Sequence, residues 1–269
     1  MVTIADVMAK LTESGPDIEN TVDVLLSGHP RTEVTGIAMT FMPSYNILSR
    51  AADLGLNLVI AHEAPFYQHR GKVDILDQDN VYRAKIGLIE KAQIAIFRFH
   101  DHMHRCDPDQ IAMGLIRDLG WSDFVGKSKM NASFPLKTPP LTIPTMSVGE
   151  IARFIKKQMD IPFVRVVGDL TWPCSRVGIL PGYCGGASLT IPFFQYEDLD
   201  LIITGEGPEW ETPEYVRDAV SLNKHRALLI LGHGKSEESG MRYLAESVSG
   251  WFPTVRVEFI KEEQPFELV

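Results

Sequence analysis

The sequence has few cysteines, no long apolar run and no excess of basic residues. Its three cysteines, Cys106, Cys174 and Cys184, are widely spaced and form no Cys-x-x-Cys pair, which argues against a disulfide framework and against a zinc ribbon. No apolar run approaches the roughly 20 residues of a membrane-spanning helix, so we expect no membrane partner. The formal net charge of −9 argues against nucleic acid as a partner, because nonspecific binding depends on Lys and Arg neutralising phosphates.

Two further absences concern location and architecture. The first residues lack the basic start and apolar core of a signal peptide, so we expect a cytoplasmic protein. Low-complexity segments and short-period repeats are absent too. A chain of 269 residues that is 45% hydrophobic and 23% charged is ordinary for a globular protein, and it is long enough for one large domain or two modest ones.

Helical and strand-like patterns alternate along most of the chain, which is typical of an α/β fold. Strands are predicted at residues 34–40, 57–61, 94–99, 163–167, 176–180, 199–204, 227–231 and 254–260. Helices are predicted at residues 45–54, 80–92, 107–119, 148–159, 212–221 and 236–249. Residues 126–144, which contain four prolines, indicate a crossover into a second subdomain.

Three of these helices have recognisable start signals. Asp107 followed by Pro108 predicts an N-cap and a first helical position. Ser147 with Glu150 three residues later has the pattern of a capping box. Ser236 is the expected N-cap of the last helix.

Imidazole and carboxylate groups directly follow three of the predicted strands. The clusters are His62-Glu63, His100-Asp101-His102-Met103-His104 and His233-x-x-x-Glu237. Ligands of open α/β sheets collect outside the carboxyl ends of the strands. Three strand ends that carry these side chains therefore predict one metal site for two ions.

Each cluster also has a plainer interpretation, which the residues alone leave open. His62 alone is typical of a polar residue capped at the rim of a buried strand. Residues 100–104 could form a solvated loop with one His packed at a helix start. Glu237 in the first turn of a helix is favoured by the helix dipole, whether or not it binds a metal.

In combination the motifs resemble those of the Nif-three-like (NGG-one-interacting-factor-three-like) family, also known as GTP cyclohydrolase 1 type 2 homologues. That family has a His-His pair, a His-x-x-x-Asp motif, a Thr-Gly-Glu turn and a final Gly-His-x-x-Ser/Thr-Glu. The corresponding segments here are Ala61-His62-Glu63-Ala64-Pro65, His100-Asp-His-Met-His104, Thr204-Gly205-Glu206 and Gly232-His233-Gly-Lys-Ser236-Glu237. The resemblance extends over nearly the whole chain.

The chain departs from the family pattern at three places. Glu63 stands where the family has the second His of the pair, and His104 stands where it has an Asp. Together these two changes exchange an imidazole and a carboxylate, so the set of three His and two acids is kept. Asp101 could replace or join His104, and His102 is also open as a ligand. Upstream, residues 40–43 replace the family's usual Asp after the first strand.

The resemblance implies two interleaved, similar α/β subdomains, residues 1–126 with 234–269 and residues 127–233, with the metal site between them. It implies two divalent ions of zinc, iron or manganese, bound by His62, Glu63, His104, His233 and Glu237. His100 and Glu206 are expected to transfer protons or to orient ligands. A ring-shaped homohexamer is also implied.

These features favour a metal-dependent hydrolase that acts on a small nucleotide-like or phosphorylated molecule. The alternative is a metal-binding assembly or regulatory protein of the same family without turnover. A third reading is an α/β ligand-binding protein without a metal. The sequence identifies neither the substrate nor the metal.

Overall fold

The computed structural model describes residues 1–13, 15–69, 77–130, 135, 137–267 and 269. The fold is mixed α/β, as predicted, with two five-stranded sheets. The helices are α1 (Ile4–Thr12), α2 (Tyr45–Asp53), α3 (Asn80–Lys91), α4 (Asp101–Arg105), α5 (Gln110–Asp118), α6 (Val148–Gln158), α7 (Ala187–Tyr196), α8 (Thr212–Ser221) and α9 (His233–Trp251), with a 3-10 turn η2 (Ser122–Phe124). The strands are β1 (Leu25–Ser27), β2 (Ile37–Thr40), β3 (Leu58–Ala61), β4 (Ala95–Arg98), β5 (Leu141–Ser147), β6 (Arg165–Val167), β7 (Pro173–Leu180), β8 (Leu201–Thr204), β9 (Ala227–Ile230) and β10 (Val257–Phe259).

The chain divides into two compact units. Unit 1 contains Met1–Cys106 and Met241–Val269, and unit 2 contains Asp107–Gly240. Unit 1 is therefore built from both ends of the chain. Residues 107–126 fall in unit 2, where α5 buries Leu115 and Ile116 against the second sheet, and the limits 126/127 and 233/234 stay a prediction.

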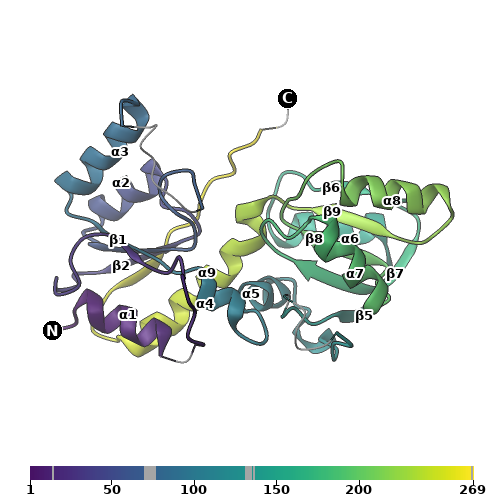
Figure 1. Cartoon of the computed structure of the whole chain (residues 1–269), viewed down its shortest axis with the longest axis horizontal. Coiled ribbons are helices and arrows are strands. Elements are labelled where there is room, and N and C mark those ends of the chain that lie inside the picture. Colours follow the sequence, from purple (N-terminus) through teal and green to yellow (C-terminus); the bar gives the residue numbers. More distant parts are fainter. Residues whose placement is uncertain (14, 70–76, 131–134, 136, 268) are drawn as a thin grey trace. The chain divides into compact units, whose positions relative to one another are not determined.

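Unit 1 has a sheet in the order β1-β4-β3-β2-β10, in which only β1 is antiparallel to its neighbour. The strands β2, β3 and β4 are buried along their whole length, which explains their continuous apolar sequence. Helices α2 and α3 cover one face of this sheet, while α1 and the C-terminal part of α9 lie along the other (Figure 1). The Lys10 ammonium of α1 lies 5.7 Å from the ring centre of Trp251, at the end of α9.

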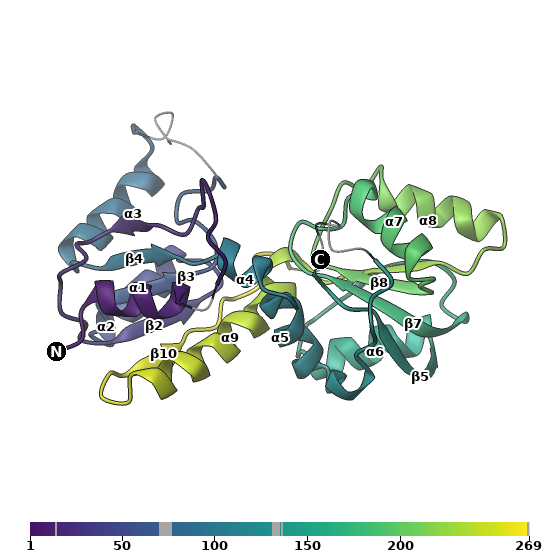
Figure 2. The same cartoon turned by 60° about the horizontal axis from the view of Figure 1, so that its bottom comes forward.

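Unit 2 has a sheet in the order β5-β7-β8-β9-β6, with three parallel central strands and an antiparallel strand at each edge. Successive residues of β8 serve opposite faces, as the pleat requires. Leu201 and Ile203 pack with α5 and α6, whereas Ile202 packs with α7 and α8. Figure 2 shows α7 and α8 on one side of this sheet and α6 on the other.

The predicted helix starts were confirmed for some helices and wrong for others. The capping box of Ser147 and Glu150 is confirmed, and α8 has the predicted bounds. The start of α5 was predicted wrongly, since Asp109 rather than Asp107 caps the helix by accepting the N–H of Ala112 at 2.9 Å. The prediction of Ser236 as an N-cap was also wrong, because α9 already begins at His233.

Some elements were not expected at all. The sequence reading missed α1, β1, α4, β5 and α7. Part of the predicted crossover, residues 131–134 and 136, lies outside the described residues. Of the helices that the structure describes, none combines the length and apolarity needed to cross a membrane.

Candidate metal centre

Unit 1 places its predicted ligands at the carboxyl ends of two neighbouring parallel strands. In the pairing of β3 with β4, Ala61 lies opposite Arg98, so His62 and Glu63 leave the sheet beside the segment that carries His100. The N–H of Glu63 donates to the carbonyl of Phe41 at 2.9 Å, which fixes the backbone at this turn. The parallel pairing of β3 with β4 therefore brings the two clusters together.

His62 and His104 face each other through their Nε2 atoms, which are 3.1 Å apart. His62 is fully buried, and its Nδ1 lies 3.3 Å from the carbonyl oxygen of Phe99. A carbonyl can only accept, so Nδ1 carries the proton and the Nε2 lone pair points toward His104. Two nitrogens bound to one ion at about 2.0–2.1 Å lie roughly 2.8–3.4 Å apart for bond angles between about 90° and 109°. The observed separation lies within this range, and it is equally that of an N–H···N hydrogen bond between the two rings.

His100 joins this pair. Its ring stacks on His62 with centroids 4.5 Å apart and lies 4.8 Å from the ring of His104. Burial, then the charge of His104, lowers the pKa of His100 to about 3, so the imidazole is neutral at pH 7. Ligand nitrogens of His62, His100 and His104 all lie within 4.8 Å of one another. The predicted proton-transfer residue is thus positioned where it can also donate a lone pair to a metal.

Glu63 belongs to a second group in the same unit, with His69 and His100. Its Oε1 lies 3.6 Å from His100 Nε2, and its Oε2 accepts a hydrogen bond of 2.6 Å from Arg98 Nη2. The Arg98 side chain is only 2% exposed. Both Arg98 and His69 were missed from the sequence, because an Arg in an apolar strand and a His in a loop carry no local signal of the contact.

Asp23 is a further residue that sequence reasoning missed. Its carboxylate accepts the N–H groups of His100, Asp101 and His102 at 2.7, 2.7 and 2.9 Å, which holds the start of α4. It also lies 2.6 Å from His102 Nδ1, so the His102 ring is held by Asp23. No local pattern could have predicted a partner nearly eighty residues away.

Asp101 is engaged on the opposite side of the same turn. Its Oδ2 accepts from Thr21 Oγ1 and the Val22 N–H, each at 3.1 Å, and its Oδ1 lies 3.0 Å from His100 Nδ1. Burial raises the pKa of Asp101, but the hydrogen bonds from Val22 and His100 outweigh it and the net direction is down. Asp101 therefore orients His100, and the geometry favours His104 over Asp101 and His102 as a ligand.

Unit 2 repeats this arrangement at the carboxyl ends of β7, β8 and β9. Leu180 pairs with Thr204 and Thr204 with Ile230, so Gly182, Glu206 and His233 follow adjacent strand ends. His233 Nδ1 lies 2.9 Å from Glu206 Oε1, and its Nε2 lies 3.1 Å from Glu237 Oε2. All three predicted residues of this unit are therefore brought together.

The two carboxylates beside His233, those of Glu206 and Glu237, favour a positive charge between them. Burial lowers the pKa of His233, but the carboxylates of Glu237 and Glu206 raise it more, and the result is about 9. The imidazole is then protonated at pH 7 and neutralises two acids, of which Glu237 is only 2% exposed. A divalent cation fits the same charge requirement once the proton has left.

A glycine keeps the space for Glu237. Gly182 has φ +62, and a Cβ there would lie 2.1 Å from Glu237 Oε1. The N–H of Gly182 donates to Ser236 Oγ at 2.8 Å, which ties the turn after β7 to the start of α9. Ser236 thus supports the site instead of capping the helix.

Cys184 in unit 2 is not suited to metal binding. Burial, then the charges of Glu237 and Asp109, raises the pKa of its thiol to about 12, whereas metals bind the thiolate. All three cysteines are free thiols. The donor sets are consequently imidazole and carboxylate, which suit zinc, iron and manganese.

Comparison with known proteins agrees with this architecture. A protein of Clostridium perfringens named GTP cyclohydrolase 1 type 2 homolog is 23% identical over 258 residues, which cover 91% of this chain and 90% of that protein. The crystal structure of a Bacillus cereus protein related to NIF3 is similar with a TM-score of 0.80 at 14% identity, covering 100% of this chain and 99% of the other. A hypothetical protein of Staphylococcus aureus gives a TM-score of 0.78 at 19% identity, with 99% of both chains covered.

A family model matches most of the chain. Residues 17–265 match the family described as Duf34/NIF3 (NGG1p interacting factor 3). This match covers most of both units, including the two imidazole and carboxylate clusters. The chain belongs to the DUF34/NIF3 family.

Proposed function

We propose that the protein binds two divalent metal ions and hydrolyses a small nucleotide-like or phosphorylated substrate. The observation that carries the proposal is the facing pair of His62 and His104 nitrogens, 3.1 Å apart, with the His62 tautomer fixed by a backbone carbonyl. His233, held between two carboxylates in unit 2, supports it independently. The proposed ligands are His62, Glu63, His104, His233 and Glu237.

When bound, a pair of such ions would polarise the scissile group and lower the pKa of a water molecule. The chain's own residues would position the reactants and move protons. His100 is neutral at pH 7 because its pKa is about 3. Only one of its ring nitrogens then carries a proton, and the other can accept a hydrogen bond or a proton. Glu206 is 44% exposed and has an oxygen 2.9 Å from His233 Nδ1, which suits it to orient that ring and to exchange protons with solvent.

The exchange of ligand types at positions 63 and 104 has a physical account in unit 1. Arg98 is buried beneath position 63, and a buried guanidinium requires a carboxylate partner. Glu63 supplies that partner through Oε2 and leaves Oε1 directed toward His100. An imidazole at position 63 would leave the Arg98 charge unpaired.

A specific observation favours the alternative, a metal-binding protein without turnover. His62, His100 and His104 form one group, and Glu63 lies within 3.6 Å of His100. Four protein ligands would fill a tetrahedral ion and leave no open position for substrate. In that case His100 would be a structural ligand instead of a proton-transfer residue.

Metal content is the first test. The untagged protein is analysed by elemental mass spectrometry after loading with zinc, iron or manganese, and about two ions per chain are expected. His62→Ala and Glu237→Ala should each lose metal, whereas His29→Ala, at an exposed histidine outside both clusters, should not. Equal metal content in all four proteins would refute the proposal.

Turnover separates the two functions. The metal-loaded protein and its His100→Gln variant are assayed on a panel of nucleotides and phosphate esters. Hydrolysis by the parent protein that is lost in the variant, with metal retained, supports the hydrolase. Full metal loading without any turnover supports the assembly or regulatory protein. We also propose the hexamer that the family resemblance implies, which light scattering tests.

A further inference from the structure

Each unit has one pair of side-chain atoms that face each other at the same distance. In the facing pair of unit 1, the Nε2 atoms of His62 and His104 are 3.1 Å apart. In the facing pair of unit 2, His233 Nε2 lies 3.1 Å from Glu237 Oε2. The first pair offers two nitrogens, whereas the second offers a nitrogen and an oxygen. The type of atom, and not the spacing, therefore distinguishes the two positions.

The groups behind the two histidines differ in the same sense. His62 Nδ1 lies 3.3 Å from the carbonyl oxygen of Phe99, which is a neutral acceptor. His233 Nδ1 lies 2.9 Å from Glu206 Oε1, which belongs to a carboxylate. A partner on the second ring nitrogen orients a ligand histidine and raises its basicity, and a carboxylate also adds negative charge. Unit 2 thus places two carboxylates around its histidine.

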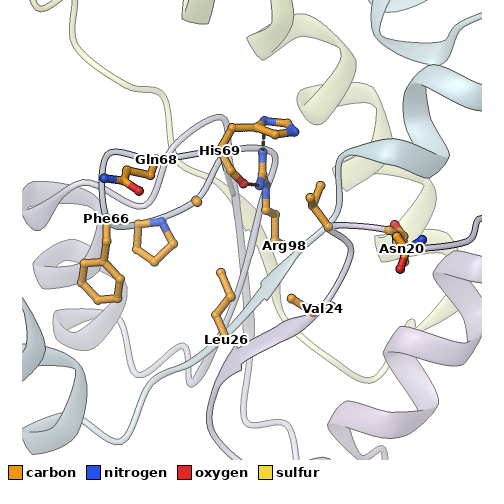
Figure 3. Close-up of a pocket in the computed structure, with 11 residues that line it drawn as sticks. Asn20, Val24, Leu26, Phe66, Gln68, His69 and Arg98 are labelled. Atoms are coloured by element: carbon orange, nitrogen blue, oxygen red, sulfur yellow. Dashed lines mark hydrogen bonds between the residues drawn. The ribbon is translucent and has the colours of Figure 1, made fainter. Parts of the chain in front are cut away.

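The charge of Glu63, the carboxylate proposed as a ligand in unit 1, is offset by a cation. Its Oε2 accepts from Arg98 Nη2 at 2.6 Å, and the Arg98 side chain is only 2% exposed. The guanidinium is held in place by two carbonyls, that of His62, which accepts from Nε at 3.1 Å, and that of His69, which accepts from Nη1 at 2.7 Å (Figure 3). An ion in unit 1 consequently gains less from Glu63 than an ion in unit 2 gains from Glu237.

Two further acids of unit 1 are directed to groups other than its facing pair. Asp101 Oδ1 lies 3.0 Å from His100 Nδ1. Asp23 accepts the N–H groups at the start of α4 and lies 2.6 Å from His102 Nδ1. These contacts leave the chemical difference between the two facing pairs as it is.

Divalent metals differ in their preference for these two kinds of atom. Imidazole nitrogen suits zinc, whereas carboxylate oxygen suits manganese. In the Irving–Williams order zinc binds more tightly than manganese at a given site, so the ligand set changes the margin between them and not the order. The margin should be wide at two nitrogens and narrower at a nitrogen and an oxygen with a carboxylate behind them.

We propose that the two positions select different metals, zinc through His62 and His104 in unit 1 and manganese through His233 and Glu237 in unit 2. The inference rests on the proposed function, because it assigns identities to the two ions which that function requires. When zinc is scarce, it occupies unit 1 and leaves unit 2 to manganese. His104, which supplies the second nitrogen of unit 1, and Glu206, which supplies the second carboxylate of unit 2, set the preference.

The first test measures the preference of each position by itself. The double variant His233→Ala/Glu237→Ala keeps the unit 1 position, and His62→Ala/His104→Ala keeps the unit 2 position. After chelator treatment, manganese binding to each full-length variant is read from the electron paramagnetic resonance of the free ion, and zinc binding from competition with a chromogenic chelator. The ratio of the manganese to the zinc dissociation constant should be larger for the unit 1 position by about tenfold, the size of effect that partner groups have on metal affinity.

A second test keeps both positions. The parent protein and single variants are incubated with equimolar zinc and excess manganese, desalted and analysed by elemental mass spectrometry. The parent should retain zinc and manganese in nearly equal amounts. Glu206→Gln should lose manganese and keep zinc, whereas Glu209→Gln, at a 78% exposed acid of the same loop, should change neither. His104→Asp, which replaces a nitrogen of unit 1 by an oxygen, should retain more manganese and less zinc.

The outcomes separate this inference from the function on which it rests. A parent protein that binds neither metal would refute both. A parent that binds both ions, but with equal dissociation-constant ratios at the two positions, would overturn metal selection and leave the two-ion proposal standing. The same holds if Glu206→Gln and His104→Asp retain zinc and manganese in the amounts found for the parent, and this result decides the matter even where a double variant does not fold.

Discussion

Gly182→Ala should destabilise the protein more than the same change at another glycine with the same backbone conformation. Gly182 has φ +62 and Gly120 has φ +68, so each alanine would incur about 1–2 kcal/mol of left-handed backbone strain. The surroundings differ, because a Cβ at Gly120 meets nothing within 4 Å. A Cβ at Gly182 would instead lie 2.1 Å from Glu237 Oε1 and 3.2 Å from His233 Nε2.

The difference between the two variants isolates the steric effect on the proposed metal ligands Glu237 and His233. Overpacking of this kind costs about 1–3 kcal/mol, so the free energy of unfolding of Gly182→Ala should fall by that much more than that of Gly120→Ala. This corresponds to a further decrease in Tm of roughly 2–12 °C for a chain of this size. Displacement of the Glu237 carboxylate should also reduce the metal content of Gly182→Ala.

Thermal unfolding followed by circular dichroism measures the first effect, and elemental analysis measures the second. Both are run on the parent protein and the two variants at the same protein and metal concentrations, since bound metal itself raises Tm. Equal decreases in Tm with unchanged metal content would show that Gly182 does not hold space for Glu237. The reasoning about the unit 2 cluster would then be refuted.

Three further predictions concern single side chains. Arg98→Met should lower the free energy of unfolding by about 3–5 kcal/mol, because it leaves Glu63 in a buried site without its cation. In urea unfolding, the double variant with Glu63→Gln should recover part of this loss, and no recovery would contradict the pairing. Burial lowers the pKa of Lys85 from 10.5 to about 8, partly offset by Glu262, so between these pH values the unfolded chain binds the extra proton and the free energy of unfolding rises with pH. That rise should be smaller in Lys85→Met, and equal slopes in the two proteins would exclude the effect. Alkylation by iodoacetamide near pH 7, read by mass spectrometry, should be slow at Cys184 because its pKa is about 12, and labelling as fast as that of an unfolded control would disprove a suppressed thiolate.

The sequence was most informative where candidate site residues lie at the ends of regular strands. His62 and His233 were found because each follows a wholly apolar run, and buried parallel strands such as β3 and β9 have that appearance. The same alternation of strands and helices predicted the α/β class. Local patterns also predicted α8 and the capping box of α6.

The parts that were missed depend on contacts between distant residues. Asp23 binds the start of α4 across more than seventy positions, and Arg98 acquires its partner only when β4 pairs with β3. Helix α7 contains Pro192, which the usual propensities exclude from a helix interior. None of these could be derived from residues that are adjacent in the chain.

The buried contact between Arg98 and Glu63 also constrains how the sequence can evolve. A change of Glu63 to histidine in this background would restore the family's pair but leave a guanidinium, 2% exposed, without a counter-charge. The fitness effect of a mutation at position 63 therefore depends on the residue at position 98, which is epistasis between a strand interior and a ligand position. A single change at either position leaves the charge of the other without its partner, so mutational paths between the two ligand arrangements are expected to require coupled changes at positions 63 and 98.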